Sequence, residues 1–116
     1  MSILKRSLKN LRIPEELSLA GLAAKAGKVV SGEFATEKAV KTGKAFLVIT
    51  ARDASENTKK KFYDMCRYYQ VPIYTIGSKE ELGRSIGKEY RASLALTDEN
   101  FSRAVINKIE KTRHEQ

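Results

Sequence analysis

Residues 45–50, Ala-Phe-Leu-Val-Ile-Thr, form an apolar run that does not alternate with polar residues. Successive side chains of a strand point to opposite faces of its sheet, so a strand with one face in water alternates. An apolar strand without alternation must be covered on both faces, which requires a layer of helices on each side of the sheet. This run therefore restricts the fold to a layered α/β arrangement.

Helix and strand signals alternate along the rest of the chain. Helices are predicted over residues 17–26, 31–42, 53–69 and 78–86 and from residue 98 onward, and further strands over residues 29–30, 71–76 and 92–97. Such alternation indicates a mostly parallel sheet. We predict a three-layer α/β/α sandwich with a central mixed sheet of about four strands. Residues 14–110 form this domain, between a basic N-terminal segment (1–13) and a polar C-terminal tail (111–116).

Local signals mark the ends and the buried faces of these helices. Gly27 and Gly43 are expected to stop the first two helices. Two pairs have capping-box spacing, and one aspartate is expected to cap the last helix: Asp53 with Glu56, Ser78 with Glu81, and Asp98. The apolar residues predicted to face the core are Leu19, Leu22, Ala23 and Ala26 in the first helix, Phe62, Met65, Cys66 and Tyr69 in the third, and Phe101, Val105 and Ile109 in the last.

The balance of charges indicates a polyanionic partner. The chain carries 22 Lys and Arg against 14 Asp and Glu, a net charge of +8 at pH 7. Such a surplus on one small domain favours RNA, DNA or an acidic membrane surface. The alternative is a cationic surface that serves only solubility.

Several function classes lack the residues that they need. One cysteine, Cys66, and one histidine, His114, cannot form an internal disulfide or the usual zinc sites. Gly27-Lys28 follows Gly21 at a spacing that does not fit a phosphate-binding loop, and no dinucleotide-binding glycine motif follows a predicted strand. No apolar run approaches the roughly 20 residues that cross a bilayer, and the start of the chain does not look like a secretory signal. We expect a cytoplasmic protein that is not an enzyme and has no cofactor.

The turn around Gly32 is the first candidate binding site. A short strand ends there and a helix begins, so free backbone N–H groups and the positive end of the helix dipole could accept a phosphate or a base edge. Glycine allows close approach of a ligand. Neighbouring hydroxyls and cations come from Ser31, Thr36, Lys28, Lys38 and Lys41. The alternative is an ordinary helix start with solvated lysines.

Five motifs at consistent spacing carry a resemblance to a known family. They are Gly27-Lys28 before the first strand, Gly32…Lys38, Gly43-Lys44-Ala45, Ala51-Arg52-Asp53 and Leu82-Gly83…Gly87. Over roughly residues 17–110 the chain resembles the kink-turn-binding ribosomal proteins. This family includes the archaeal and eukaryotic large-subunit proteins seven-A-e and thirty-e. Among its bacterial members, the chain looks most like the short ribosomal-like proteins encoded beside translation-factor genes.

The resemblance implies an α/β/α sandwich and RNA recognition at two places. These are the Gly32 turn with the start of the following helix, and the loop of residues 86–93 before the last strand. The RNA-binding residues that it suggests, together with the charge pattern, are Lys28, Ser31, Gly32, Glu33, Phe34, Thr36, Lys38, Lys41, Arg52, Tyr90 and Arg91. The expected partner is ribosomal or other structured RNA, with ribosomal proteins as a second class. We expect a monomer with no membrane partner.

The chain departs from the family motif where bases are read. The motif has two polar residues, which contact guanine edges, where this sequence has Phe34 and Ala35, while Glu33 and Glu37 add negative charge nearby. Phenylalanine cannot donate a directional hydrogen bond, but it could stack on a base, a contact worth about 1–3 kcal/mol. Two hypotheses therefore stay open, a kink-turn RNA and a different structured RNA.

A second function class is a protein-interaction module. The segment of residues 1–13 has apolar residues at helical spacing among four cations. Through it the chain could dock on a ribosomal protein or a translation factor, with the charge serving only to steer association. Loss of association on deleting residues 1–13 would favour this alternative.

Overall fold

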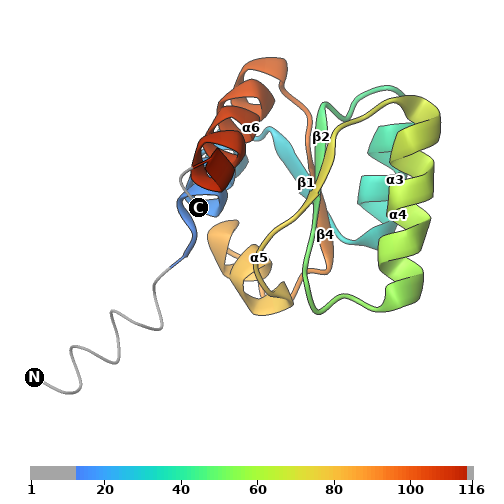
Figure 1. The fold of residues 1–116 in the computed structure, drawn as a ribbon, viewed down its shortest axis with the longest axis horizontal. Coiled ribbons are helices and arrows are strands. Elements are labelled where there is room, and N and C mark those ends of the chain that lie inside the picture. The colour runs from blue at the N-terminus through green and yellow to red at the C-terminus, as the bar shows by residue number, and fades with distance from the viewer. Residues whose placement is uncertain (1–12, 115–116) are drawn as a thin grey trace, which may run out of the picture.

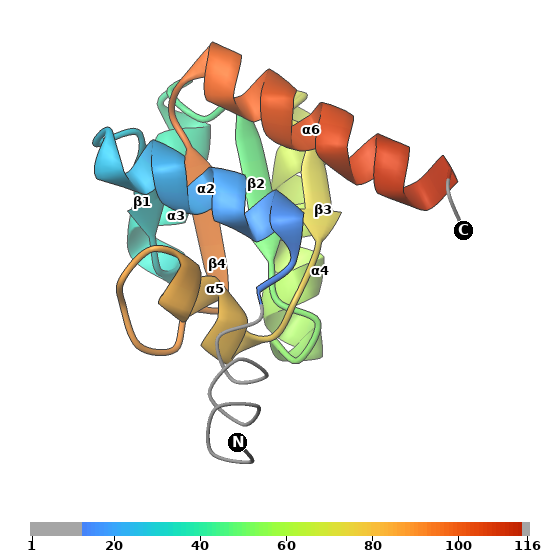
Figure 2. The same cartoon turned by 90° about the vertical axis from the view of Figure 1, so that its left-hand side faces the viewer.

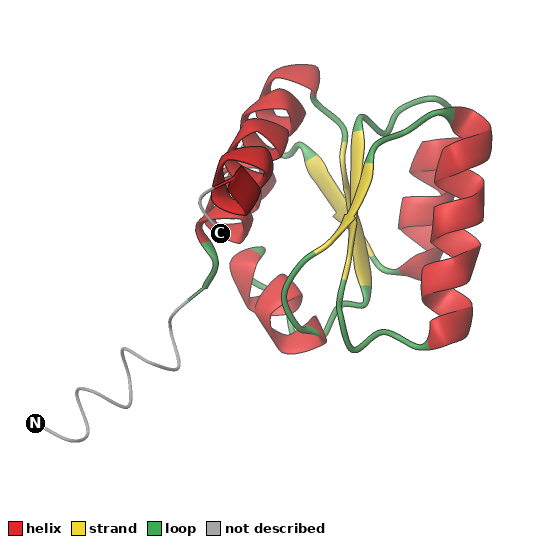
Figure 3. Ribbon diagram, in the orientation of Figure 1, coloured by secondary structure: helices red, strands yellow, loops and turns green. Residues whose placement is uncertain are grey.

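The computed structural model describes residues 13–114, so the basic N-terminal segment lies outside the described residues except for Ile13. Five helices and four strands alternate in the described part of the chain (Figure 3). In chain order they are α2 (Glu15–Lys25), β1 (Val29–Ser31), α3 (Glu33–Lys41), β2 (Leu47–Thr50), α4 (Glu56–Tyr69), β3 (Ile73–Thr75), α5 (Lys79–Ser85), β4 (Ser93–Leu96) and α6 (Glu99–His114). The predicted order of elements is confirmed, and α6 continues into the stretch assigned to the tail.

The sheet is mixed, with the strand order β1-β4-β2-β3. Only β2 and β3 are parallel, whereas β4 runs antiparallel to both of its neighbours. The mixed sheet of four strands is confirmed, but the expectation of mostly parallel pairing is wrong. The reason is the length of α5, which has seven residues and spans about 10 Å. It stays at the end of the sheet where β3 stops, so β4 starts from that same end (Figure 1).

Helices cover both faces of the sheet. The helices α3 and α4 lie on one face, and α2, α5 and α6 lie on the other (Figure 1), with α2 and α6 side by side (Figure 2). In β2, Leu47 and Ile49 belong to the core under α2, α5 and α6, whereas Val48 belongs to the core under α3 and α4. The apolar run therefore serves two cores, which confirms the three-layer sandwich.

Most of the predicted helix ends are confirmed. Gly27 and Gly43 have φ of +75°, and Ser78 and Glu81 form a complete capping box at the start of α5. Asp98 Oδ2 accepts a hydrogen bond of 2.8 Å from Phe101 N at the start of α6. The predicted cap of α4 is wrong, because Ser55 is its N-cap. Asp53 instead accepts a hydrogen bond of 2.8 Å from Lys79 N, the first residue of α5.

Two predicted core faces need correction. In α2 the buried residues are Leu17, Ala20 and Ala23, while Leu22 is 53% exposed, because α5 and α6 pack against the other side of the helix. In α4, Phe62 and Cys66 are buried, but Tyr69 is exposed at the end of the helix. In α6, Val105 and Ile109 are buried and Phe101 packs partly buried against the same core, as predicted.

Candidate nucleic-acid interface

The ends of the strands gather several loops at one end of the sheet. Ser31, the last residue of β1, pairs with Leu94 near the start of β4. Thr50, the last residue of β2, pairs with Ser93 on one side and with Thr75 of β3 on the other. The Gly32 turn, residues 51–55 and residues 86–92 therefore lie together at the lower end of the molecule in Figure 1. We call these three segments the loop end.

The two predicted recognition segments form one continuous surface at the loop end. Arg91 Nε donates a hydrogen bond of 3.0 Å to Ser31 Oγ, across 60 residues of sequence. Gly32 N donates a hydrogen bond of 3.0 Å to Ser93 O. Gly32 has φ of +92°, a conformation that side chains with a Cβ adopt with difficulty, and this turn directs the chain from β1 into α3.

Arg52 joins the same surface from the loop after β2. Its neighbour Ala51 donates a backbone hydrogen bond of 2.9 Å to Ala92 O, and Arg52 N donates one of 2.7 Å to Gly77 O. The Arg52 side chain is exposed. Two arginines, Arg52 and Arg91, are therefore held next to the ends of paired strands. Because their backbone is already fixed, binding of an anion would cost less conformational entropy.

The loop of residues 86–92 rests on α5. Lys88 N donates a hydrogen bond of 2.8 Å to Gly83 O, and Arg91 N donates one of 3.0 Å to Lys79 O. The Arg91 guanidinium also donates to Tyr90 O at 2.8 Å. These bonds fix the loop while the Tyr90 ring stays 66% exposed, available for contact with a partner.

The first turn of α3 contains one strongly exposed residue, Phe34, and one fully buried residue, Thr36. Phe34 is 80% exposed, and no side chain caps the helix among the described residues. Thr36 is fully buried, and its hydroxyl lies 3.4 Å from that of Ser93. Thr36 therefore joins α3 to β4 and cannot offer its hydroxyl to a ligand at the surface.

The two glutamates of this turn are paired with lysines. Lys61 of α4 lies 2.8 Å from a Glu33 carboxylate oxygen and 2.7 Å from one of Glu37, and Lys41 lies 2.7 Å from the other oxygen of Glu37. The hydrogen bonds that Lys41 and Lys61 donate to Glu37 lower its pKa to about 2. Those that Lys61 donates to Glu33 and Glu37 raise the pKa of Lys61. The negative charge expected beside the Gly32 turn is therefore largely compensated.

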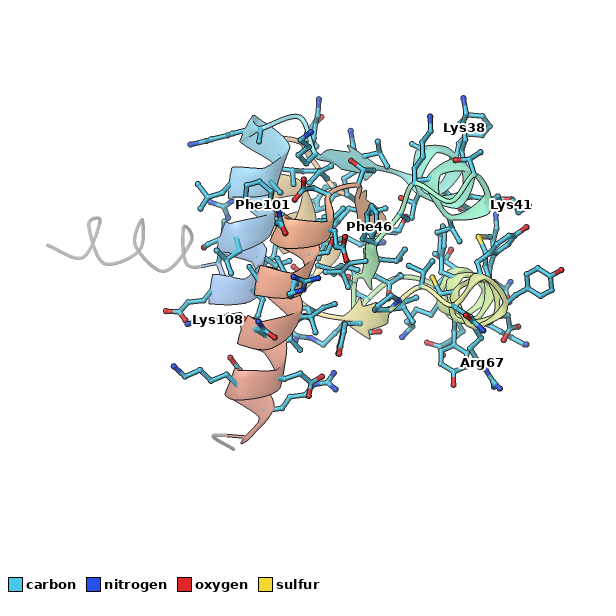
Figure 4. All side chains as sticks on the ribbon, turned by 90° about the horizontal axis from the view of Figure 1, so that it is seen from above. Lys38, Lys41, Phe46, Arg67, Phe101 and Lys108 are labelled. Atoms are coloured by element: carbon cyan, nitrogen blue, oxygen red, sulfur yellow. The ribbon has the colours of Figure 1, made fainter. Side chains whose placement is uncertain are left out.

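Two of the predicted cations lie away from the loop end. Lys28 precedes β1, and its carbonyl accepts a hydrogen bond from Thr97 N at the opposite end of β4. Lys41 is the last residue of α3, about 12 Å along the helix from its start. Lys38 lies between the two ends, and Figure 4 shows Lys38 and Lys41 projecting from different sides of α3.

Two residues near α3, Lys61 and Lys44, were not among the predicted site residues. Lys61 is 28 residues from Glu33, so nothing local indicates their ion pair. Lys44, three residues after the end of α3, lines the same shallow groove as Lys38. Lys44 could have been suspected, since it belongs to the Gly43-Lys44-Ala45 motif.

Other classes of site gain no support from the described residues. Burial raises the pKa of the Cys66 thiol to about 11, which keeps it protonated at neutral pH. Within residues 13–114 no three His, Cys, Asp or Glu side chains come together as metal ligands. None of the helices described is long and apolar enough to cross a bilayer.

The resemblance predicted from the motifs is confirmed by comparison with known proteins. The family described as ribosomal protein L7Ae/L30e/S12e/Gadd45 matches residues 17–106. The RNA-binding protein YlxQ of Bacillus subtilis (strain 168) is 46% identical over 96 residues, which are 83% of this chain and 96% of that protein.

Two solved structures share the fold. A protein of unknown function from Bacillus halodurans C is 42% identical, with a TM-score of 0.80 over 84% of this chain and 98% of that one. The 15.5kD RNA binding protein of Giardia lamblia is 27% identical, with a TM-score of 0.71 over 82% of this chain and 84% of that one. The α/β/α sandwich is therefore the fold of these relatives as well.

Proposed function

Because this chain belongs to the ribosomal protein L7Ae/L30e/S12e/Gadd45 family, we propose that it binds structured RNA through the loop end, in association with the ribosome or the translation machinery. The proposed role is binding without catalysis. Two relatives named as RNA-binding proteins, YlxQ of Bacillus subtilis and the 15.5kD protein of Giardia lamblia, support the proposal.

One observation carries the proposal, the hydrogen bond from Arg91 to Ser31. It joins the loop before β4 to the Gly32 turn, so two segments far apart in the sequence present one surface. RNA is often recognised by shape, with its bases extruded from the helix, and such a target needs contacts from more than one loop. The ends of paired strands hold this surface in place before RNA arrives.

The charges at the loop end fit an RNA backbone. Neither Arg52 nor Arg91 takes part in an ion pair among residues 13–114, whereas Lys61 compensates Glu33 and Glu37. Arg52 can therefore bind a phosphate in the bidentate geometry that guanidinium groups favour. Arg91 can offer a phosphate the N–H groups that its bonds to Ser31 and Tyr90 do not use. Tyr90, which is exposed beside Arg91, offers a flat ring for a base.

Affinity for two RNAs of equal length tests the proposal. One is a hairpin with tandem G·A pairs beside a bulge of unpaired nucleotides, and the other is a fully paired hairpin. We expect tighter binding of the first, and a loss of affinity of about tenfold or more on changing Arg52 and Arg91 together to alanine. Removal of one arginine–phosphate interaction should lower the slope of log Kd against log salt by about 0.7–0.9.

A matched control is Lys111→Ala, which removes one exposed positive charge from α6 on the other face of the sheet. It should leave the affinity within about twofold. Crosslinking the protein to RNA in cells and sequencing the bound fragments identifies the target. Scattered fragments with no enriched RNA, together with equal affinity for the two hairpins, would contradict the proposal.

A further inference from the structure

A shallow groove runs along the outer side of α3, where the helix packs beside the edge strand β1. Its volume is about 330 Å³, at the lower end of the roughly 300–1,000 Å³ typical of ligand pockets. Val30 of β1 and Ala35 of α3 contribute apolar surface, and Phe34 stands at the end nearest the Gly32 turn. The groove is therefore continuous with the proposed RNA surface at the loop end.

Phe34 is poorly placed for stability but well placed for binding. Its side chain is 80% exposed, so its ring contributes little to the core. Residues four apart on a helix lie one above the other, so Phe34 and Lys38 share a face of α3. This arrangement offers a flat apolar ring with a cation next to it, which matches a base and the phosphate attached to its nucleotide.

The cations of the groove are free to meet phosphates. Lys38 and Lys44 both line it, and neither ammonium group forms an ion pair within the described part of the chain. By contrast, the other two lysines near α3, Lys41 and Lys61, are paired with glutamates. Among the residues that the structure describes, no carboxylate lines the groove, so an anion entering it meets attraction without a neighbouring repulsion.

A larger cavity near β3 lacks these properties. Its volume is about 590 Å³, and Glu56, Lys59 and Lys60 are among its lining residues. Lys59 lies 2.9 Å from Glu56, and Lys60 lies 2.8 Å from Asp64, so both of these lysines are already paired. Charge complementarity to a polyanion therefore favours the smaller groove along α3.

We propose that this groove takes one unpaired base of the bound RNA, stacked on Phe34, with the flanking phosphates on Lys38 and Lys44. The inference rests on the proposed RNA binding and adds the part of the RNA that is recognised there. A base inside a duplex is covered on both faces by its neighbours, so only an extruded base can stack on the ring. At this position the motif of the family has a polar residue that contacts a base edge, whereas Phe34 would stack on the face of a base. Stacking depends little on the RNA sequence.

Phe34→Ala tests the inference with the bulged hairpin described above. We expect its affinity for the bulged hairpin to fall by about 5- to 150-fold, the range for loss of one base stacked on an aromatic ring. The slope of log Kd against log salt should stay unchanged, since this substitution removes no cation. Lys38→Ala with Lys44→Ala should instead lower that slope by about 1.4 if the phosphates belong to unpaired nucleotides.

Two further variants separate stacking from folding. Tyr68→Ala removes another aromatic ring that is 80% exposed, from α4, and should leave the affinity within about twofold. Phe34→Trp should keep the affinity, because indole also stacks on bases. A 2-aminopurine placed in the bulge gives a direct signal, since its fluorescence is quenched by stacking. We expect quenching by the unmodified protein and by Phe34→Trp but much less by Phe34→Ala.

The outcomes distinguish this inference from the proposed function. If Phe34→Ala binds the bulged hairpin within twofold of the unmodified protein, while the Arg52 and Arg91 double variant loses affinity, the inference is wrong and RNA binding stands. Binding of an acidic peptide that Phe34→Ala abolishes, with RNA affinity unaffected, would assign the groove to a protein instead. If the unmodified protein binds neither hairpin, the proposed function and the inference fail together.

Discussion

The loop that carries Tyr90 and Arg91 depends on the absence of a side chain at Gly83. A Cβ at this position would lie 1.1 Å from Glu89 O and 3.2 Å from Lys88 O. Real Cβ contacts shorter than 3.0 Å are essentially never found, so the loop backbone would have to retreat by about 2 Å. Gly83→Ala is therefore expected to displace residues 86–92 from α5.

The expected magnitude follows from two opposing effects. Alanine in place of glycine inside a helix stabilises by about 0.8–1.0 kcal/mol, because Gly83 has ordinary helical geometry in α5. Overpacking costs about 1–3 kcal/mol, and displacing the loop also weakens the hydrogen bond from Lys88 N to Gly83 O. We expect the free energy of unfolding to fall by about 1–2 kcal/mol. Displacement of the loop should also weaken the hydrogen bond between Arg91 and Ser31. Because that bond joins the two parts of the proposed RNA surface, we expect the RNA affinity to fall as well.

Urea unfolding and binding of the bulged hairpin measure the two effects. The matched control is Gly27→Ala, where a Cβ would meet nothing within 4 Å but φ is +75°. It should cost about 1–2 kcal/mol from backbone strain alone and leave RNA affinity unchanged. A Gly83→Ala protein that is more stable than the original and binds RNA equally well would refute the argument, because helix propensity would then have decided the outcome.

Two further predictions concern stability. Ser78→Ala removes the side chain that accepts a hydrogen bond of 3.1 Å from Glu81 N, and should lower the free energy of unfolding by about 1 kcal/mol in urea; an unchanged midpoint would show that the capping box contributes little. The pKa of Glu37 is lowered from 4.5 to about 2 by Lys41 and Lys61, so its contribution to stability is present above pH 4.5 and is lost as the pH falls towards 2. Over that range Glu37→Gln should lose less stability than the original protein in urea unfolding, and parallel losses would contradict this pairing.

The candidate site illustrates what a motif can and cannot locate. The family resemblance predicts the Gly32 turn and residues 86–93 as two separate places, and the fold brings them into contact. Thr36 matched the motif by position, yet it is buried against Ser93. The side chain of Thr36, the fourth residue of α3, points towards β4. That direction depends on how the helix packs on the sheet.

The sequence by itself determined the features that depend on residues a few positions apart. The capping box of Ser78 and Glu81, the left-handed turns at Gly27 and Gly43, and the burial of β2 (Leu47–Thr50) on both faces follow from backbone sterics and side-chain periodicity. Phe46, in the same apolar run, is 40% exposed. These effects act within one turn of helix or one strand, so their signals are local.

Only the tertiary structure decided what depends on segments that are distant in the sequence. Asp53 caps α5 instead of α4, β4 enters the sheet antiparallel, and Lys61 neutralises the glutamates beside the Gly32 turn. Exposure was decided in the same way, since Phe34 and Tyr68 stay open to solvent only because no described element packs over them. The hydrogen bond between Arg91 and Ser31 spans 60 residues, and it exists because β4 returns between β1 and β2 to form the loop end.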